Sequence, residues 1–127
     1  MSNKKISKII GIVGTRRRNS NKDYKIIKAK FLELYRDGDF ICSGLCPKGG
    51  DRFAFLLANL YIPPDRRLWF PPEWEKYGKT AGFIRNTKMA RVSEYLIACI
   101  AKDRKGGTED TIKKFITFHG KKNLYIV

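Results

Sequence analysis

The segment at residues 78–91, GKTAGFIRNTKMAR, carries the residue types best suited to chemistry. It is typical of a helix start, where Thr80 is expected to act as the N-cap and accept a backbone N–H. Arg85 and Asn86 follow one turn later, where the positively polarised start of a buried helix suits an anion. The planar guanidinium of Arg85 fits a phosphate or a carboxylate. The alternative is that Arg85 forms a structural ion pair and that Asn86 lies on the surface.

The rest of the chain alternates between short apolar runs and segments with a helical period. Gly38 is expected at the C-cap of the first helix. Strands are expected at residues 8–13, 40–42, 67–70, 95–101 and 123–127, and helices at residues 24–35, 51–60, 80–92 and 110–119.

This alternation predicts an α/β protein with a Rossmann-like, three-layer architecture. Five parallel strands in the order 3-2-1-4-5, with helices on both faces, satisfy the right-handed crossover rule. The whole chain, 1–127, is expected to form a single domain, in which residues 1–7 form a basic N-terminal arm.

Small and polar residues follow four of the predicted strands. The carboxyl ends of parallel strands lie at one edge of the sheet, which is where open α/β sheets bind ligands. Glycines there let a phosphate approach the backbone, hydroxyls donate hydrogen bonds, and arginines supply charge. Asp51 has the alternative role of capping its own helix. The predicted ligand-binding residues are Gly14, Thr15, Arg16, Ser43, Gly44, Asp51, Arg85, Asn86, Met89, Gly106, Gly107 and Thr108.

Composition limits the partners of the protein. A net charge of +15 predicts attraction to small anions or polyanions. No apolar run approaches the roughly 20 residues of a membrane span, and the apolar run at residues 9–13 is too short for a signal peptide, so a cytoplasmic protein without a membrane partner is expected. One histidine and three cysteines do not complete a metal site, and no metal or other cofactor is expected.

The motifs at the predicted sheet edge resemble a known family. The segments 69–74 (WFPPEW) and 78–90 resemble the proline-x-x-tryptophan loop and the alanine-glycine-x-x-arginine-asparagine-x-x-methionine helix of the YspA/YpsA-related branch of the SLOG superfamily. Segments 14–16, 49–52 and 106–108 look like its glycine-rich motifs, so the resemblance covers nearly the whole chain. It implies a Rossmann-like fold that binds nucleotides or nucleotide-derived ligands. Dimers or larger assemblies occur among its members, which makes a homo-oligomer a further expectation.

More distant members of that superfamily suggest a reaction. The Lonely Guy enzymes hydrolyse the N-glycosidic bond of nucleoside monophosphates, and the resemblance assigns Arg85 to that scheme. The carboxylate position of those hydrolases corresponds to Thr111 here. Glu109 and Asp110 are close by and are the tentative catalytic acids, with first-turn helix acids as the alternative interpretation.

Two other functions stay open at this stage. DNA-processing protein A, a distant member of the superfamily, binds single-stranded DNA, and the basic arm and charge of this chain suit the same partner. Trp69, Trp74 and Tyr77 could stack bases if they are exposed. The third hypothesis is an interaction protein that has kept the fold without the ligand.

Overall fold

The computed structural model describes residues 7–127, so the predicted basic arm lies almost wholly outside the described residues. The fold is organised around a five-stranded parallel sheet in the order β3-β2-β1-β4-β5. This order confirms the predicted topology. The strands are β1 (Ile9–Gly14), β2 (Phe40–Ser43), β3 (Arg67–Trp69), β4 (Tyr95–Cys99) and β5 (Leu124–Ile126).

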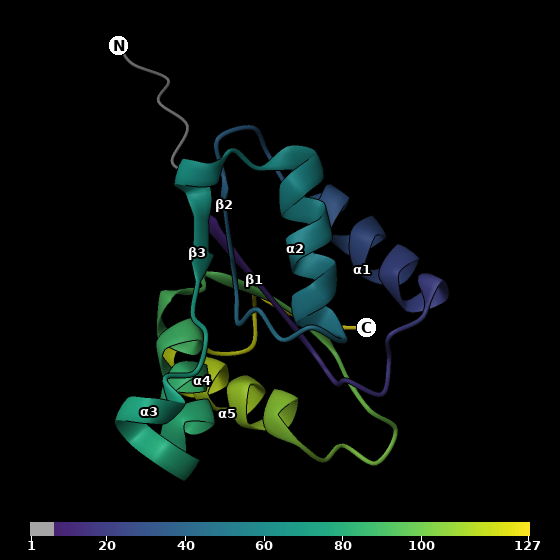
Figure 1. The fold of residues 1–127 in the computed structure, drawn as a ribbon. Coiled ribbons are helices and arrows are strands. Elements are labelled where there is room, and N and C mark those ends of the chain that lie inside the picture. Colours follow the sequence, from purple (N-terminus) through teal and green to yellow (C-terminus); the bar gives the residue numbers. More distant parts are fainter. Residues whose placement is uncertain (1–6) are drawn as a thin grey trace.

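Four helices of three or more turns cover the two faces of this sheet. Helices α1 (Asn21–Leu34) and α2 (Gly50–Tyr61) lie on one face, and α4 (Ala81–Val92) and α5 (Gly107–His119) lie on the other (Figure 1). A one-turn helix, α3 (Trp74–Tyr77), precedes α4. The arrangement is the predicted three-layer, Rossmann-like architecture.

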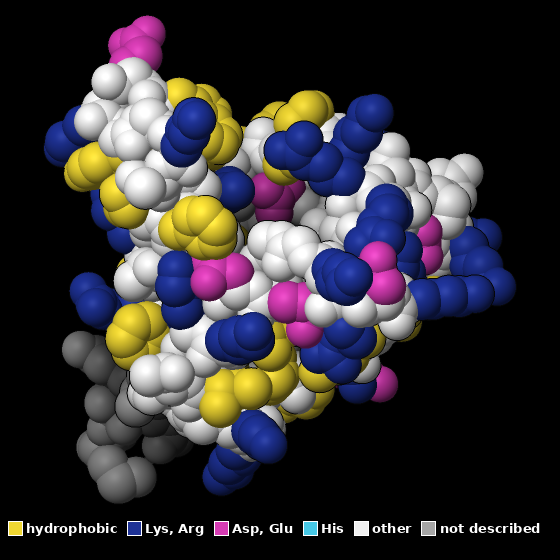
Figure 2. Space-filling view, turned by 90° about the horizontal axis from the view of Figure 1, so that it is seen from below, with side chains coloured by type: hydrophobic (Ala, Val, Ile, Leu, Met, Phe, Trp, Pro, Cys, Tyr) yellow, Lys and Arg dark blue, Asp and Glu magenta, His cyan; other side chains and the backbone are white. Residues whose placement is uncertain are grey.

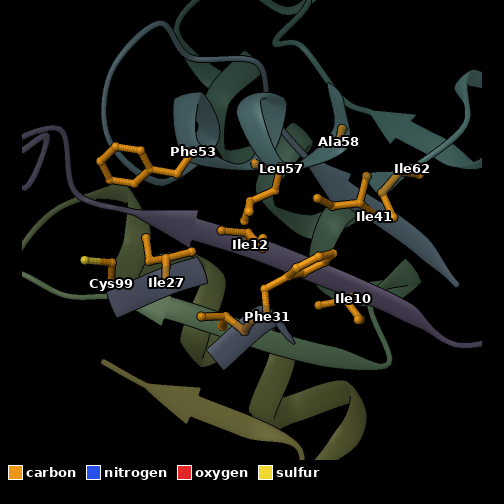
Figure 3. Close-up of a cluster of buried hydrophobic side chains, with 12 residues drawn as sticks. Ile10, Ile12, Ile27, Phe31, Ile41, Phe53, Leu57, Ala58, Ile62 and Cys99 are labelled. Atoms are coloured by element: carbon orange, nitrogen blue, oxygen red, sulfur yellow. The ribbon is translucent and has the colours of Figure 1, made fainter. Parts of the chain in front are cut away.

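Side chains of β1 alternate between two apolar cores, as expected for a strand buried on both faces. Ile10 and Ile12 belong to the core beneath α1 and α2, where they pack with Phe31 and Leu57 (Figure 3). Val13 points to the other side and belongs to the core beneath α4 and α5. The two cores hold the carboxyl ends of β1 and β4 rigidly against the starts of the helices.

Two helices, α1 and α5, start three residues earlier than the sequence predicts. Helix α1 begins three residues earlier than expected, because Ser20 and Asp23 bond to each other. The Ser20 hydroxyl accepts from the Asp23 backbone N–H at 3.1 Å, and the Asp23 carboxylate accepts from the Ser20 backbone N–H. This capping box fixes the start of the helix. Helix α5 begins at Gly107, and the predicted helix 110–119 is therefore too short at its start.

The end of α1 also differs. Helix α1 ends at Leu34, and Gly38 lies beyond it in the turn to β2 with φ +97°, so its prediction as a C-cap is wrong. Asp39 organises this turn by accepting backbone hydrogen bonds from Lys8 and Arg36.

The segment before α4 turns through a short 3₁₀ helix at Gly78–Thr80. Thr80 precedes α4, but its backbone is already helical and its hydroxyl donates to the carbonyl of Tyr77 at 2.9 Å. The predicted N-cap hydrogen bond from a backbone N–H to Thr80 is therefore wrong. The 3₁₀ turn runs directly into α4, and the backbone N–H of Ala81 donates to the carbonyl of Gly78, so this N–H needs no side-chain cap.

Candidate functional site

A cavity of about 380 Å³ opens at the carboxyl edge of the sheet, between the end of β1 and the first turns of α4 and α5. We call it the main cavity. Figure 2 shows this face of the molecule, where Lys and Arg side chains spread around a hollow. Ten of the twelve predicted ligand residues line the main cavity, and the two that do not are Ser43 and Gly44. The volume lies in the range of about 300–1,000 Å³ that small-molecule sites occupy.

The first turn of α5 forms one wall of the main cavity. Its N-cap is Gly106, which has φ +117° and no side chain to occupy the backbone N–H groups of the turn. Gly107 and Thr108 follow, and Thr108 is nine-tenths buried with its side chain at the cavity. A helix start with free N–H groups and a positive dipole end suits an anion.

The end of β1 forms the floor. Thr15 continues the ladder by donating its backbone N–H to the carbonyl of Cys99 at 2.9 Å. A Cβ atom on Gly14 would lie 3.0 Å from the backbone of Gly50, so only glycine lets α2 start this close to the strand. Gly14 and Thr15 therefore line the main cavity directly beside the start of α2.

Arg85 lies at the centre of the site and is mostly buried, with 17% of its side chain exposed. Its Nε donates to Oδ1 of Asn86 at 2.9 Å, and Nη1 donates to the carbonyl of Gly44 at 3.2 Å. Nη1 also lies 3.8 Å from Oδ2 of Asp51. Arg85 thus forms the ion pair that the alternative interpretation expected, and it lines the main cavity as well.

Asn86 links α4 to α5. Its Nδ2 donates to the carbonyl of Gly107 at 3.3 Å and to Oδ2 of Asp110 at 3.2 Å. Asn86 is 7% exposed, so the alternative interpretation that it is a surface residue is wrong. It positions the guanidinium of Arg85 relative to the first turn of α5.

Asp51 lies in the first turn of α2, where Gly49 is the N-cap, and its side chain turns away from the helix instead of capping it. Its carboxylate accepts from the Ser43 hydroxyl at 2.8 Å and from the backbone N–H of Cys46 at 3.0 Å. Burial raises the pKa of Asp51 above its usual value, although these hydrogen bonds and the charge of Arg85 act in the opposite direction.

Ser43 and Gly44 support the site from behind. The Ser43 hydroxyl also lies 2.6 Å from the carbonyl of Ile12, so it ties β2 to β1 and to Asp51. A Cβ atom on Gly44 would collide with the guanidinium of Arg85. Both residues are buried and neither lines the main cavity, so their prediction as ligand contacts stays a prediction.

Glu109 and Asp110 do not line the main cavity. Glu109 accepts two hydrogen bonds from Arg104 at 2.8 and 2.9 Å, and Asp110 pairs with Lys114 at 2.9 Å. Since α5 starts at Gly107, helical geometry turns Thr108 and Thr111 to the cavity, whereas Glu109 bonds to Arg104 and Asp110 bonds to Asn86 and Lys114. The prediction that these acids are catalytic gains no support from their positions.

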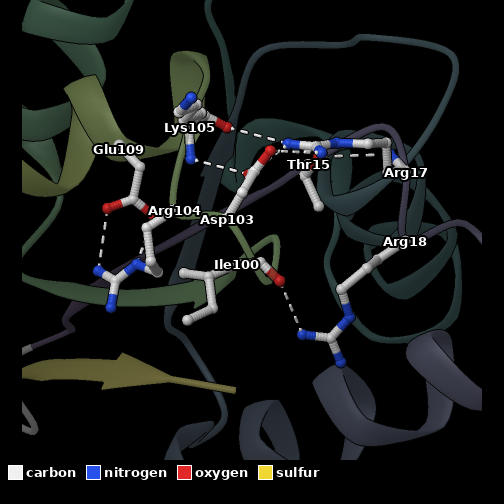
Figure 4. Close-up of polar contacts among 8 residues, drawn as sticks. All are labelled: Thr15, Arg17, Arg18, Ile100, Asp103, Arg104, Lys105 and Glu109. Atoms are coloured by element: carbon white, nitrogen blue, oxygen red, sulfur yellow. Dashed lines mark hydrogen bonds and ion pairs between the residues drawn. The ribbon is translucent and has the colours of Figure 1, made fainter.

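Several residues of the cavity wall escaped the sequence analysis. Arg17 donates to both carboxylate oxygens of Asp103 at 2.8 and 2.9 Å and to the carbonyl of Lys105 (Figure 4). This ion pair joins the loop after β1 to the loop after β4 and brings Lys105 to the rim. The charge run at residues 16–18 was a visible signal, but nothing in the sequence paired Arg17 with Asp103. The cavity residues that were not predicted are Val13, Arg17, Cys46, Lys105 and Thr111.

The cations of the main cavity outnumber its anions. Arg16, Arg17, Arg85 and Lys105 line it, whereas Asp51 is the one acidic side chain among its described lining residues. Within residues 7–127, no three His, Cys, Asp or Glu side chains group in a way that could hold a metal ion. No helix in this range is long and apolar enough to cross a membrane.

Comparisons with protein-family models, curated proteins and solved structures gave no match to this chain. The resemblance to the SLOG superfamily therefore stays a prediction from the sequence motifs.

Proposed function

We propose that the protein binds a small phosphorylated ligand, a nucleotide or a nucleotide derivative, in the main cavity. One observation carries this proposal: the start of α5, with its N-cap Gly106, lies around the same cavity as three cationic side chains. These side chains are Arg85, Arg16 and Lys105. A phosphate satisfies all of these groups at once, because it accepts from backbone N–H groups and pairs with guanidinium forks.

Each group has a role in this binding mode. The N–H groups of Gly107 and Thr108 and the Thr108 hydroxyl hold the phosphate oxygens. Arg85, held by Asn86 and Gly44, donates from the opposite wall. Asp51 accepts from a ribose hydroxyl. The carboxylate is held in place by Ser43 and Cys46, so it presents a fixed acceptor.

A hydrolytic form of this proposal gives Asp51 a second role. Cleavage of an N-glycosidic bond develops positive charge on the sugar, which a carboxylate stabilises. Asp51 is the acidic side chain that the described part of the chain supplies to the main cavity. If base release occurs, Asp51→Asn should abolish it while ligand binding persists, and chromatography of the reaction products measures this.

The proposal is tested by calorimetric titration with nucleoside mono- and diphosphates, cyclic nucleotides and dinucleotides at physiological salt. Arg85→Ala should weaken binding of the best ligand roughly tenfold to a hundredfold, since hydrogen bonds between charged groups contribute about 1.5–3 kcal/mol. Arg91→Ala is the matched control, because Arg91 lies on the same helix and packs over Phe118, 4.9 Å from its ring centre. An equal effect of the two substitutions would contradict the proposal.

A second candidate function, binding of single-stranded nucleic acid, is favoured by a different surface. Arg17, Arg18, Lys22 and Lys102 line a wide concavity of about 770 Å³ on the α1 side of the sheet edge. Binding there should weaken steeply with added salt and respond to a Lys22→Ala, Lys102→Ala double variant rather than to Arg85→Ala. Fluorescence anisotropy with a labelled oligonucleotide at several salt concentrations distinguishes the two sites.

A further inference from the structure

A second, smaller cavity of about 160 Å³ lies at the carboxyl end of β3. The side chains of Trp69, Phe70 and Tyr77 line it together with Ala81 and Ile84 from the start of α4. We call it the aromatic cavity. Its volume is below the roughly 300 Å³ at which pockets for whole ligands begin, so it suits one part of a ligand.

Arg85 joins the aromatic cavity to the main cavity, because it lines both. Helix α4 presents Ala81, Ile84, Arg85 and Lys88 to the aromatic cavity, and it presents Arg85, Asn86 and Met89 to the main one. A ligand that occupies both cavities therefore has to pass the Arg85 side chain.

The two cavities differ in chemical character. The main cavity combines four cations with one buried carboxylate. In the aromatic cavity, Lys88 is paired with Glu73 at 3.5 Å, so charge is nearly balanced and aromatic surface dominates. A ligand that matches both hollows has an anionic group at one end and a flat ring at the other.

Tyr77 offers the ring surface for such a group. The ammonium groups of Lys76 and Lys88 lie 5.1 and 5.8 Å from the centre of its ring, a distance typical of cation–π contacts. Both lysines are exposed, so a stacked base would only have to displace solvated ammonium groups from the ring. The carboxylate of Glu73 and the ammonium of Lys88 then lie at the rim as hydrogen-bonding partners for the ring edge.

We propose that the aromatic cavity binds the base of a nucleotide whose phosphate lies at the start of α5. This inference rests on the proposed function and adds to it the place where the base of the nucleotide binds. It makes Tyr77 a residue that determines specificity and makes Arg85 the group that spans phosphate and base.

The test compares two probes, a set of nucleoside 5′-monophosphates and ribose 5-phosphate, by calorimetric titration. The best monophosphate should bind the wild-type protein roughly tenfold or more tightly than ribose 5-phosphate, because base stacking on an aromatic side chain contributes about 1–3 kcal/mol. Tyr77→Ala should remove this difference and leave ribose 5-phosphate unaffected. Tyr77→Phe should keep it, since the ring persists.

Phe83→Ala is the matched control, because Phe83 is an aromatic residue of α4 that is 58% exposed and lines neither cavity. Equal binding of the two probes to the wild-type protein, or an equal loss for both in Tyr77→Ala, would overturn the inference and leave phosphate binding intact. If neither probe binds, the proposed function fails and this inference fails with it.

Discussion

Two helices of this protein start with the same kind of sequence at the same edge of the sheet, and their starts have different surroundings. Helix α2 starts at Gly49-Gly50-Asp51, and α5 starts at Gly106-Gly107-Thr108. Both N-cap glycines have a positive φ, +75° and +117°. A helix start of this kind can bind a phosphate through its backbone N–H groups.

The start of α2 is closed by the protein itself. The N–H of Gly49 donates to Oδ1 of Asn19 at 2.8 Å, and a Cβ atom on Gly49 would lie 2.5 Å from the carbonyl oxygen of Thr15. Gly50 packs against the backbone of Gly14 so closely that a Cβ atom would overlap it. The glycines of α2 therefore serve helix–strand packing.

The start of α5 is open. A Cβ atom on Gly106 would meet nothing within 4 Å, and one on Gly107 would meet Nδ2 of Asn86 at 3.8 Å. Both glycines line the main cavity. The comparison teaches that a pair of glycines at a helix start lets another group approach the backbone closely. Which segments of the protein pack nearby decides whether that group is backbone or a ligand.

The largest expected effect concerns stability at the two starts. Gly50→Ala should lower the free energy of unfolding by about 1–3 kcal/mol, because the added methyl group overlaps the backbone of β1. Gly107→Ala places the same group in ordinary van der Waals contact with Asn86, at 3.8 Å, and should change the free energy of unfolding by less than about 1 kcal/mol. Urea unfolding of both variants measures the difference, and similar losses would show that both starts are packed.

A smaller effect is expected on ligand binding. Gly107→Asp adds a negative charge in the first turn of α5, which favours the helix dipole but repels a phosphate. Affinity for a nucleoside monophosphate should fall roughly tenfold, since like charges about 4 Å apart cost about 1–4 kcal/mol near a surface. Thermal unfolding should be unchanged or slightly raised. Unchanged affinity would remove α5 from the binding site.

The smallest effect concerns the carboxylate of Asp51 at the start of α2. Burial raises the folded-state pKa of Asp51, so the native state holds its proton more tightly than the unfolded chain does. This contribution to stability is therefore greatest below the unfolded value of about 3.8 and is lost as pH rises through the folded pKa. Asp51→Asn lacks the titration, so its stability relative to the wild-type protein should increase with pH across this window. Urea unfolding at a series of pH values measures it, and parallel curves would contradict the assignment.

The fold could be predicted because the sequence patterns that define its strands and helices each lie within one short segment. Apolar runs such as residues 9–13 and 95–99 define buried parallel strands, and the helical period defines the connections. The carboxyl-edge rule then gathered Gly14, Thr15, Arg85 and Thr108 correctly, because strand order alone determines which loops meet.

What escaped prediction depends on contacts between distant segments. The phase of α5, which starts at Gly107, brings Thr111 to the main cavity and leaves Glu109 and Asp110 outside its lining. The pairing of Arg17 with Asp103 spans loops that are 86 residues apart in sequence. The enclosure of Ser43 and Gly44 by Asp51 and Arg85 is likewise a property of packing.

The most direct test of the central claim is a titration with a nucleoside monophosphate followed by backbone amide NMR. The open start of α5 predicts that the amide signals of Gly107 and Thr108 shift with a single saturable curve, while those of Gly49 and Gly50 move far less. Larger shifts at the start of α2 than at the start of α5, or no saturable shift at either, would contradict the account.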